Sequence, residues 1–355
     1  MLAALRARPA LRTALRIGAA IVIVGLVVWL VLVPQIPAAR ADIQKLASVS
    51  PMAIVAAALA EAASLLVFSL LTRTILGRGG PSYGRLLPID LADLAANHTL
   101  PGGGATAAAI RFRLLHAEGL STRRALTAAT VETVISNLVL GGVFLIGAIG
   151  TIGRAAPSAA LIVAVAAVLV LSAASVVATW GLLRHGEAIR RGARAVGRRV
   201  PLLTEERAEG LVIEATRVVR EILRDRRRSA LAAITAAGNW LLDATALWLV
   251  LWAFGASVDP LILLAAYGVA TILAQLPLTP GGLGIVEATL TVALTGFGVA
   301  HGPALLGVLG WRVLEYWLPI PIGWACYLFL RIAPGGGARD VRPSPVGDRP
   351  SMLKS

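Results

Sequence analysis

Long apolar stretches alternate with short arginine-rich ones along most of this chain. A helix needs about 20 apolar residues to cross the hydrocarbon core of a bilayer, and several stretches reach that length. Hydropathy predicts eight spans, two of them short: 15–33, 51–71, 125–149, 159–183, 229–254, 261–278, 284–300 and 304–330. The pattern predicts an all-α, polytopic membrane helix bundle of about six full spans plus two broken or re-entrant helix pairs. Whether 261–300 forms two full spans or one re-entrant pair stays open.

The segment 86–110 is too polar to face lipid, although it is apolar in parts. It is broken at Pro101, and arginines flank it on both sides, within 73–85 and 111–124. Because basic loops stay in the cytoplasm, the segment should enter and leave on the same side. We predict a re-entrant helix pair buried against protein. Its polar residues are Asp90, Asp93, Asn97 and His98.

The same charge rule orients the remaining loops. It places the loops 34–50 and 150–158 outside, and the basic segment 184–228 inside together with both termini. The flanks 255–259 and 298–303 carry no Arg or Lys, so both should be outside. We expect a multi-pass plasma-membrane protein with cytoplasmic N- and C-termini.

The segment 184–228 holds 13 Arg against 7 acidic residues, and apolar residues recur at helical spacing over 204–224. We predict an amphipathic cytoplasmic helix there, lying on the head groups or on the bundle. Residues 333–355 consist of Pro, Gly, Ser and charged residues, which predicts a disordered tail. Residues 1–332 then form a single membrane domain.

Composition narrows the function classes. The chain is 57% hydrophobic with 5% aromatic residues and a net charge of +14, and its mean hydropathy is +0.80. The arginines lie between apolar runs, as expected beside anionic lipid, so we exclude nucleic acid as a partner. The single cysteine, Cys326, allows no intramolecular disulfide. The four histidines lack metal-ligand spacing, and we expect no metal, no cofactor and no catalytic residue.

Two helix-breaking strings are near-copies of one another. Pro101, Gly102, Gly103 and Gly104 form the first, and Pro280, Gly281, Gly282, Leu283 and Gly284 form the second. Their prolines are 179 residues apart. Acidic residues repeat at nearly the same offset: Glu61 precedes Asp243 by 182 residues, and Glu132 precedes Glu315 by 183.

These offsets predict two repeats, at about 51–150 and 229–331. The first break opens from inside and the second from outside, which is the inverted-repeat arrangement of alternating-access transporters. The site should lie where the breaks meet. The half-helices that start near Ala105 and Ile285 would offer free N–H groups to a phosphate or carboxylate.

Each acidic side chain inside a span raises the free energy of membrane insertion by about 2.5 to 3.5 kcal/mol. Glu61, Glu132, Asp243, Glu287 and Glu315 should therefore face the bundle interior.

Purely structural interpretations of some of these acids stay open. Arg312 and Asn239 lie one turn before Glu315 and Asp243, and could neutralise them locally. Glu132 could extend toward Arg123 or Arg124. Glu287 has no local partner.

The second break carries a longer motif. Gln275 to Glu287 reads QLPLTPGGLGIVE and is followed by Trp311 and Arg312. It resembles the signature of the lysylphosphatidylglycerol synthase transmembrane domain family, also called flippase-like proteins. The first break, Arg111 to Leu115, Gly119 to Ser121 and Glu132 resemble the first half of that family, so the likeness covers about residues 15–331.

The resemblance implies a domain that moves or presents a lipid, such as an aminoacylated phospholipid or a polyprenyl-linked sugar. Only residues 331–355 follow the last predicted span, so we expect a transporter without a soluble synthase domain. We expect Arg111 or Arg312 to hold a lipid phosphate and the five acids to contact a cationic head group or carry protons. The expected partners are anionic phospholipid or polyprenyl-phosphate lipid.

Two alternatives remain. One is a non-transporting subunit that uses 184–228 to scaffold a membrane-associated glycosyltransferase or lipid-modifying synthase. The other is an intramembrane enzyme, which would need two acids within reach of one lipid bond.

Overall fold

The computed structural model describes residues 50–100, 103–151, 159–199, 205–275 and 279–332. All regular secondary structure in these ranges is helical, which confirms the predicted all-α class. The predicted first span, 15–33, and the tail 333–355 lie outside the described residues. So do Pro101 and Gly102 of the first break.

Four helical segments of the described chain are long and apolar enough to cross a membrane. They are α3 (Pro51–Leu76), α6 (Thr122–Gly150), α10 (Arg226–Ala253) and the run His301–Ile332. That run consists of α13 (His301–Arg312), the π-helical turn η5 (Val313–Trp317) and α14 (Pro319–Ile332). The helix α7 (Ala159–Arg184) coincides with the predicted span 159–183.

The remaining apolar helices are short and come in two broken pairs. The first pair is α4 (Tyr83–Thr99) and α5 (Gly104–Ala117). The second is α11 (Pro260–Ala274) and α12 (Ile285–Gly296), joined through the 3-10 turn η4 (Pro280–Gly282). At about 1.5 Å per residue, α12 extends only roughly 18 Å, well short of a bilayer core of about 30 Å. Of the two possibilities that the sequence left open for 261–300, two full spans or a re-entrant pair, the helix lengths favour the broken pair.

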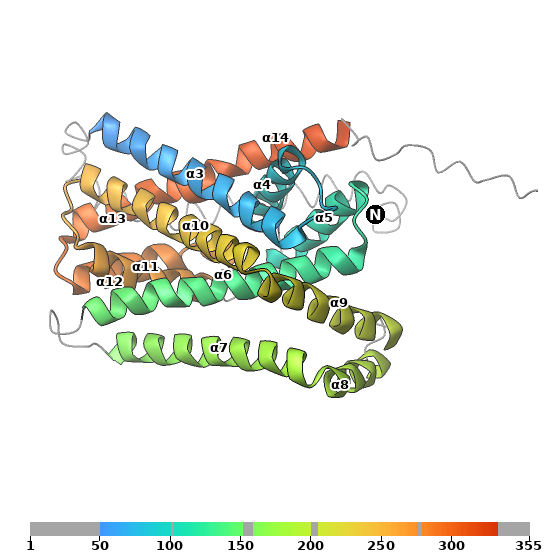
Figure 1. The fold of residues 1–355 in the computed structure, drawn as a ribbon. Coiled ribbons are helices and arrows are strands. Elements are labelled where there is room, and N and C mark those ends of the chain that lie inside the picture. Colours follow the sequence, from blue (N-terminus) through green and yellow to red (C-terminus); the bar gives the residue numbers. More distant parts are fainter. Residues whose placement is uncertain (1–49, 101–102, 152–158, 200–204, 276–278, 333–355) are drawn as a thin grey trace, which may run out of the picture.

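The two broken pairs enter the bundle from opposite ends. The pair α4–α5 starts and ends near α9, whereas α11–α12 starts and ends at the far end, beside the start of α13 (Figure 1). This is the arrangement expected from the charges of their flanks. Internal symmetry between the two halves stays a prediction.

Local sequence explains where several helices begin. Ser50, Ser121, Asp225 and Asp259 each accept a hydrogen bond from a backbone N–H in the first turn of α3, α6, α10 and α11. Such caps satisfy donors that have no partner within the helix.

The centre of the bundle is the contact between α3 and α10, which run side by side (Figure 1). Leu247 and Leu251 of α10 are fully buried in one apolar cluster with α11, α12 and α13. Leu71 and Ile75 of α3 belong to a second cluster with α4, α6 and α9. Large apolar side chains such as Met52 of α3 are exposed, as expected for a surface that faces lipid.

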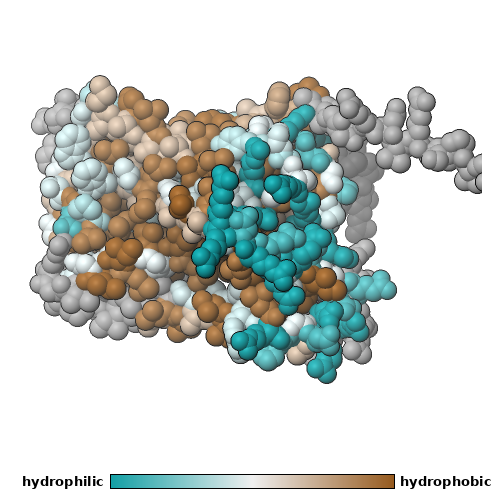
Figure 2. All heavy atoms as spheres, viewed as in Figure 1, coloured by the Kyte–Doolittle hydropathy of each residue, from teal (hydrophilic) through white to brown (hydrophobic). Residues whose placement is uncertain are grey.

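A charged lobe closes one end of the bundle. It is formed by α8 (Gly186–Arg199) and α9 (Glu205–Arg224), and hydrophilic residues gather there while the rest of this face is largely apolar (Figure 2). The predicted helix at 204–224 is α9, and it packs on the bundle because Val218 and Ile222 are buried in the second cluster. The sequence analysis missed α8.

Candidate functional site

A buried charge cluster surrounds Arg111 of α5. Its guanidinium donates to both carboxylate oxygens of Glu132 on α6, at 3.0 and 3.1 Å, and lies 2.9 Å from Asp90 of α4. The hydroxyl group of Thr72 on α3 bridges these two side chains, because it accepts a hydrogen bond from Arg111 and donates one to Glu132. Asp93 lies at 4.0 Å. The cluster therefore ties four helices together around one positive charge.

Glu132 does not extend toward the arginines at the start of α6. Arg124 instead donates to the carbonyl oxygens of Leu76 and Arg78. Arg111 is closer and buried, and it offers two parallel N–H groups that match a carboxylate. The snorkelling interpretation was wrong.

A second charge cluster holds the break between α11 and α12. Arg312 of α13 donates to Glu287 at 2.7 Å, to Glu315 at 2.6 Å and to the carbonyl oxygen of Gly281 at 3.0 Å. The Arg312 guanidinium also lies 4.4 Å from the ring centre of Tyr316. The local ion pair between Arg312 and Glu315, which the sequence left open, is present. Glu287, 25 residues before Arg312 in the chain, is its second carboxylate partner.

The two helix N-termini that follow the breaks differ. The backbone N–H of Gly284 donates to Glu287 at 2.6 Å, so the start of α12 already carries a carboxylate. Binding of an anion by the first-turn N–H groups of α12 stays a prediction. Helix α5 has Gly103 at its N-cap position, and no described side chain caps it.

A third group joins the two central helices. Asp243 of α10 accepts from the hydroxyl of Tyr267 at 2.6 Å and from the indole N–H of Trp311 at 2.8 Å. The carboxyl group of Glu61 on α3 faces it. The sequence left open a local hydrogen bond between Asn239 and Asp243. That interpretation was wrong, because the side-chain amide of Asn239 donates to Ser64 instead.

A cavity of about 410 Å³ connects these groups. Five of the predicted site residues line it: Glu61, Gly104, Arg111, Asp243 and Glu315. It lies between α3, α4, α5, α6 and α10, with Glu315 of η5 completing the wall. Its size is in the range of small-molecule sites, which are typically about 300 to 1,000 Å³.

The other predicted site residues that the structure describes do not line the cavity. Glu132 supports Arg111 from behind, while Gly281, Glu287 and Arg312 hold the second break closed. Pro280 starts η4, Gly282 is buried there and Gly284 is the N-cap of α12. Gly103 lies beside Asn97.

The cavity also contains residues that the sequence analysis did not select. Asp90, Asp93 and Asn97 line it together with the aromatic side chains of Phe68 and Trp240. The sequence did contain a signal for Asp90, Asp93 and Asn97, because these residues made the segment 86–110 too polar to face lipid. The aromatic residues carried no distinguishing pattern.

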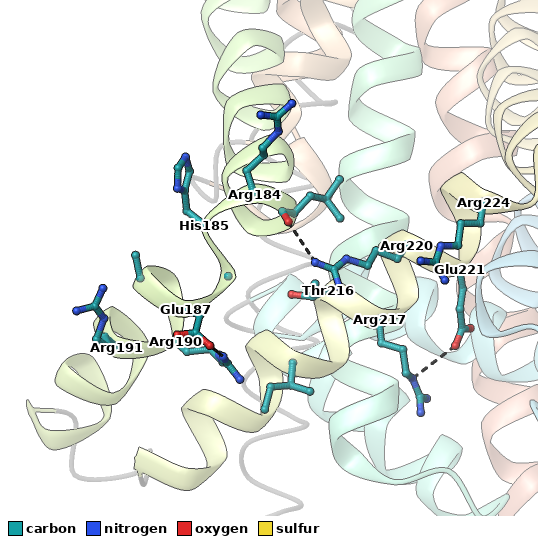
Figure 3. A pocket seen from close by; sticks show the side chains of 14 residues that line it. Arg184, His185, Glu187, Arg190, Arg191, Thr216, Arg217, Arg220, Glu221 and Arg224 are labelled. Carbon is teal, nitrogen blue, oxygen red and sulfur yellow. Dashed lines mark hydrogen bonds and ion pairs between the residues drawn. The ribbon is translucent and has the colours of Figure 1, made fainter.

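A larger, basic groove lies outside the bundle, between α9 and the junction of α7 with α8. It encloses about 920 Å³. Figure 3 shows Arg220 directed at the backbone of α7, where it donates to Leu183, and Arg190 paired with Glu187. Arg191 and Arg224 form no ion pair or hydrogen bond with any described residue. The arginines that line it are Arg184, Arg190, Arg191, Arg217, Arg220 and Arg224, with Glu187 and Glu221 as its acids.

Long apolar helices around enclosed charges and a polar cavity define a polytopic helical membrane protein. The chain belongs to the family described as the lysylphosphatidylglycerol synthase TM region, whose model matches residues 15–323. The resemblance seen in the two break motifs is thereby confirmed.

Two relatives match shorter parts of the chain. The inner membrane protein YbhN of Escherichia coli (strain K12) is 32% identical over 92 residues, which is 26% of this chain and 28% of that protein. A UPF0104 membrane protein of Methanothermobacter thermautotrophicus is 27% identical over 84 residues, 24% of this chain and 25% of the relative. The chain therefore matches only about a quarter of each relative's length.

Proposed function

We propose that this protein is a lipid flippase, which moves a phospholipid or polyprenyl-linked lipid across the plasma membrane. The observation that carries the proposal is the polar cavity inside an otherwise apolar bundle. A charged cavity at this position costs stability, so a ligand for it is the simplest explanation. Its volume suits a lipid head group whose acyl chains stay in the bilayer.

The chemistry of the lining indicates the kind of head group. Arg111 lines the cavity, and its Nε has no hydrogen-bond partner among the described residues. A phosphate oxygen could accept from it, assisted by the uncapped start of α5.

The same cavity holds an excess of carboxylates. Among the described residues that line it are the acids Glu61, Asp90, Asp93, Asp243 and Glu315, against a single basic residue, Arg111. Both oxygens of Asp90 lack a well-oriented hydrogen-bond donor. This excess favours a head group that carries an amine as well as a phosphate.

The opposite entry of the two broken pairs supports movement rather than mere binding. Alternating access needs elements that can open toward each side of the membrane. Helices α4–α5 reach the cavity from the basic end, which the positive-inside rule assigns to the cytoplasm. The second break reaches α4 from the other end.

The test is lipid scrambling in reconstituted liposomes, with an acyl-chain fluorophore and chemical quenching of the outer leaflet. Ala108 lines the cavity, whereas its neighbour Ala109 on α5 is exposed. We expect Ala108→Phe to abolish most lipid movement by filling the cavity and Ala109→Phe to retain it. Equal rates in the two variants would remove the cavity from the transport path.

A second candidate function is favoured by the basic groove. A scaffold subunit could hold an acidic face of a membrane glycosyltransferase or synthase against the unpaired Arg191 and Arg224. Removing α9 would not test this cleanly, because Val218 and Ile222 are part of the core. The double substitution of Arg191 and Arg224 to Glu should abolish co-purification of such an enzyme from native membranes and leave lipid movement intact. Arg73→Glu, exposed outside the groove, is the control.

A further inference from the structure

Two carboxyl groups meet at the contact between α3 and α10. Glu61 and Asp243 are 5% and 9% exposed and both line the cavity. They also occupy matching positions of the two predicted repeats. Two neighbouring buried carboxyl groups do not both ionise without a counter-charge, because burial and mutual repulsion disfavour the second negative charge, so one of the two keeps a proton.

The other partners of Asp243 decide which group carries that proton. Its Oδ2 accepts from Tyr267 and its Oδ1 accepts from Trp311. With a donor at each oxygen, Asp243 is held as the carboxylate. Glu61 is then the protonated partner, and its Oε2 is buried without any hydrogen-bond partner.

Among the residues that the structure describes, no positively charged side chain pairs with Glu61 or Asp243. Glu315 faces it from η5, but that carboxylate is paired with Arg312. Across the cavity, Arg111 of α5 is engaged by Glu132 and Asp90, and Asp93 faces it from α4. Tyr267 of α11 is a donor, and α6 contributes Ala129 and Thr133 to the wall. Because these charged side chains already have partners, the proton on Glu61 is the counter-charge for Asp243.

We propose that the Glu61–Asp243 pair is a proton-binding site that exchanges its proton for the amine of the lipid head group. When an ammonium group enters the cavity, the O–H bond of Glu61 breaks and its proton passes to water in the cavity. The ammonium replaces the proton as counter-charge. When the lipid leaves on the other side, Glu61 is protonated again from that side. The lipid and the proton therefore move in opposite directions.

This inference rests on the proposed flippase function, and it is tested on the full chain in liposomes with the membrane voltage clamped. The probes are acyl-labelled phosphatidylethanolamine, which carries an amine, and phosphatidylglycerol, which does not. For one proton exchanged per lipid, a pH difference of one unit should enrich the amine lipid about tenfold in the leaflet facing the acidic side. Phosphatidylglycerol should show no enrichment.

The variant Glu61→Gln keeps a donor for Asp243 but has no proton to release. We expect it to lose the pH-driven enrichment, while Glu187→Gln, an exposed acid on α8, keeps it. Lipid movement by the wild type without enrichment, or enrichment that persists in Glu61→Gln, would overturn the proton site and leave the flippase standing.

A direct spectroscopic measurement distinguishes a failure of the proton site from a failure of the flippase function. Infrared difference spectra across a pH titration should contain a protonated-carboxyl C=O band that disappears in Glu61→Gln. A band without any lipid movement would leave a proton site but refute the flippase and the coupling. Absence of the band would refute the proton site, whatever the lipid does.

Discussion

The imidazole ring of His98 stacks on the phenol ring of Tyr316, with ring centroids 4.2 Å apart. The Tyr316 hydroxyl donates to the carbonyl oxygen of His98 at 2.6 Å, and the His98 Nδ1 lies 3.1 Å from the carbonyl oxygen of Tyr316. His98 lies near the end of α4, and Tyr316 is in η5, 218 residues later. This double link joins the approach to the first break to the last long helical run.

Gly281 of the second break fits against this ring pair. Its φ is +55°, and a Cβ there would collide with Tyr316 and come within 2.9 Å of His98. We expect Gly281→Ala to destabilise the protein by more than about 1 kcal/mol, because both the backbone conformation and the space are unfavourable. The measurement is thermal unfolding in detergent. Gly296→Ala, at a helical position with no atom within 4 Å, should leave the midpoint unchanged.

The cluster around Arg111 should be the most sensitive charge site. Arg111→Met leaves Glu132 and Asp90 as buried carboxylates without their cation, which we expect to cost about 3 to 5 kcal/mol. Adding Asp90→Asn should recover part of the loss. Denaturant unfolding in detergent checks both.

A surface pair provides the comparison. Arg217 and Glu214 on α9 are 2.7 Å apart, but Arg217 is 56% exposed. Breaking it with Arg217→Met should cost at most about 1 kcal/mol. Equal costs for Arg111→Met and Arg217→Met would contradict a structural role for the buried cluster.

Several elements were predictable because a local pattern carries them. Apolar length identified α3, α6, α7 and α10, and Pro-Gly strings identified both breaks. The helical period of apolar residues identified α9. Each of these signals lies within one short window of sequence.

The ion-pair and hydrogen-bond partners of the buried acids were less predictable, since they depend on which helices pack against each other. Glu287 had no partner within its own segment, and only the packing of α12 against α13 brings Arg312 to it. Similarly, Asp243 had Asn239 one turn away, yet it bonds to Tyr267 and Trp311 from other helices. Hydropathy left 261–300 open between two full spans and a re-entrant pair, because it measures apolarity and not helix length.

The contact between α8 and α9 should depend on pH. Arg194 of α8 donates two hydrogen bonds of 2.7 Å to the carboxylate of Glu209 on α9. These hydrogen bonds favour the ionised form and lower the pKa of Glu209. A lowered pKa means that the contact is fully formed above the ordinary range of glutamate and is lost as the pH falls through the lowered value.

Spin labels at the exposed positions Ala188 and Glu206, in a Cys326→Ser background, measure this contact. We expect the interlabel distance distribution to broaden only in acid. In Glu209→Gln the distribution should be broad at every pH. A wild-type pH response that survives in Glu209→Gln would assign it to another group.

Close packing of α6 against α11 depends on a glycine without a side chain. A Cβ on Gly147 would collide with the backbone of Ala265 and come within 2.9 Å of the carbonyl oxygen of Leu261. Small residues at helix contacts let backbones approach in membranes, where packing replaces the hydrophobic effect as the driving force. We expect Gly147→Val to separate α6 from α11 and lower the unfolding midpoint in detergent. Gly142→Val, on the same helix with no atom within 4 Å of its Cβ, is the matched control and should fold normally. Equal midpoints for the two variants would mean that α11 does not pack on α6 at this glycine.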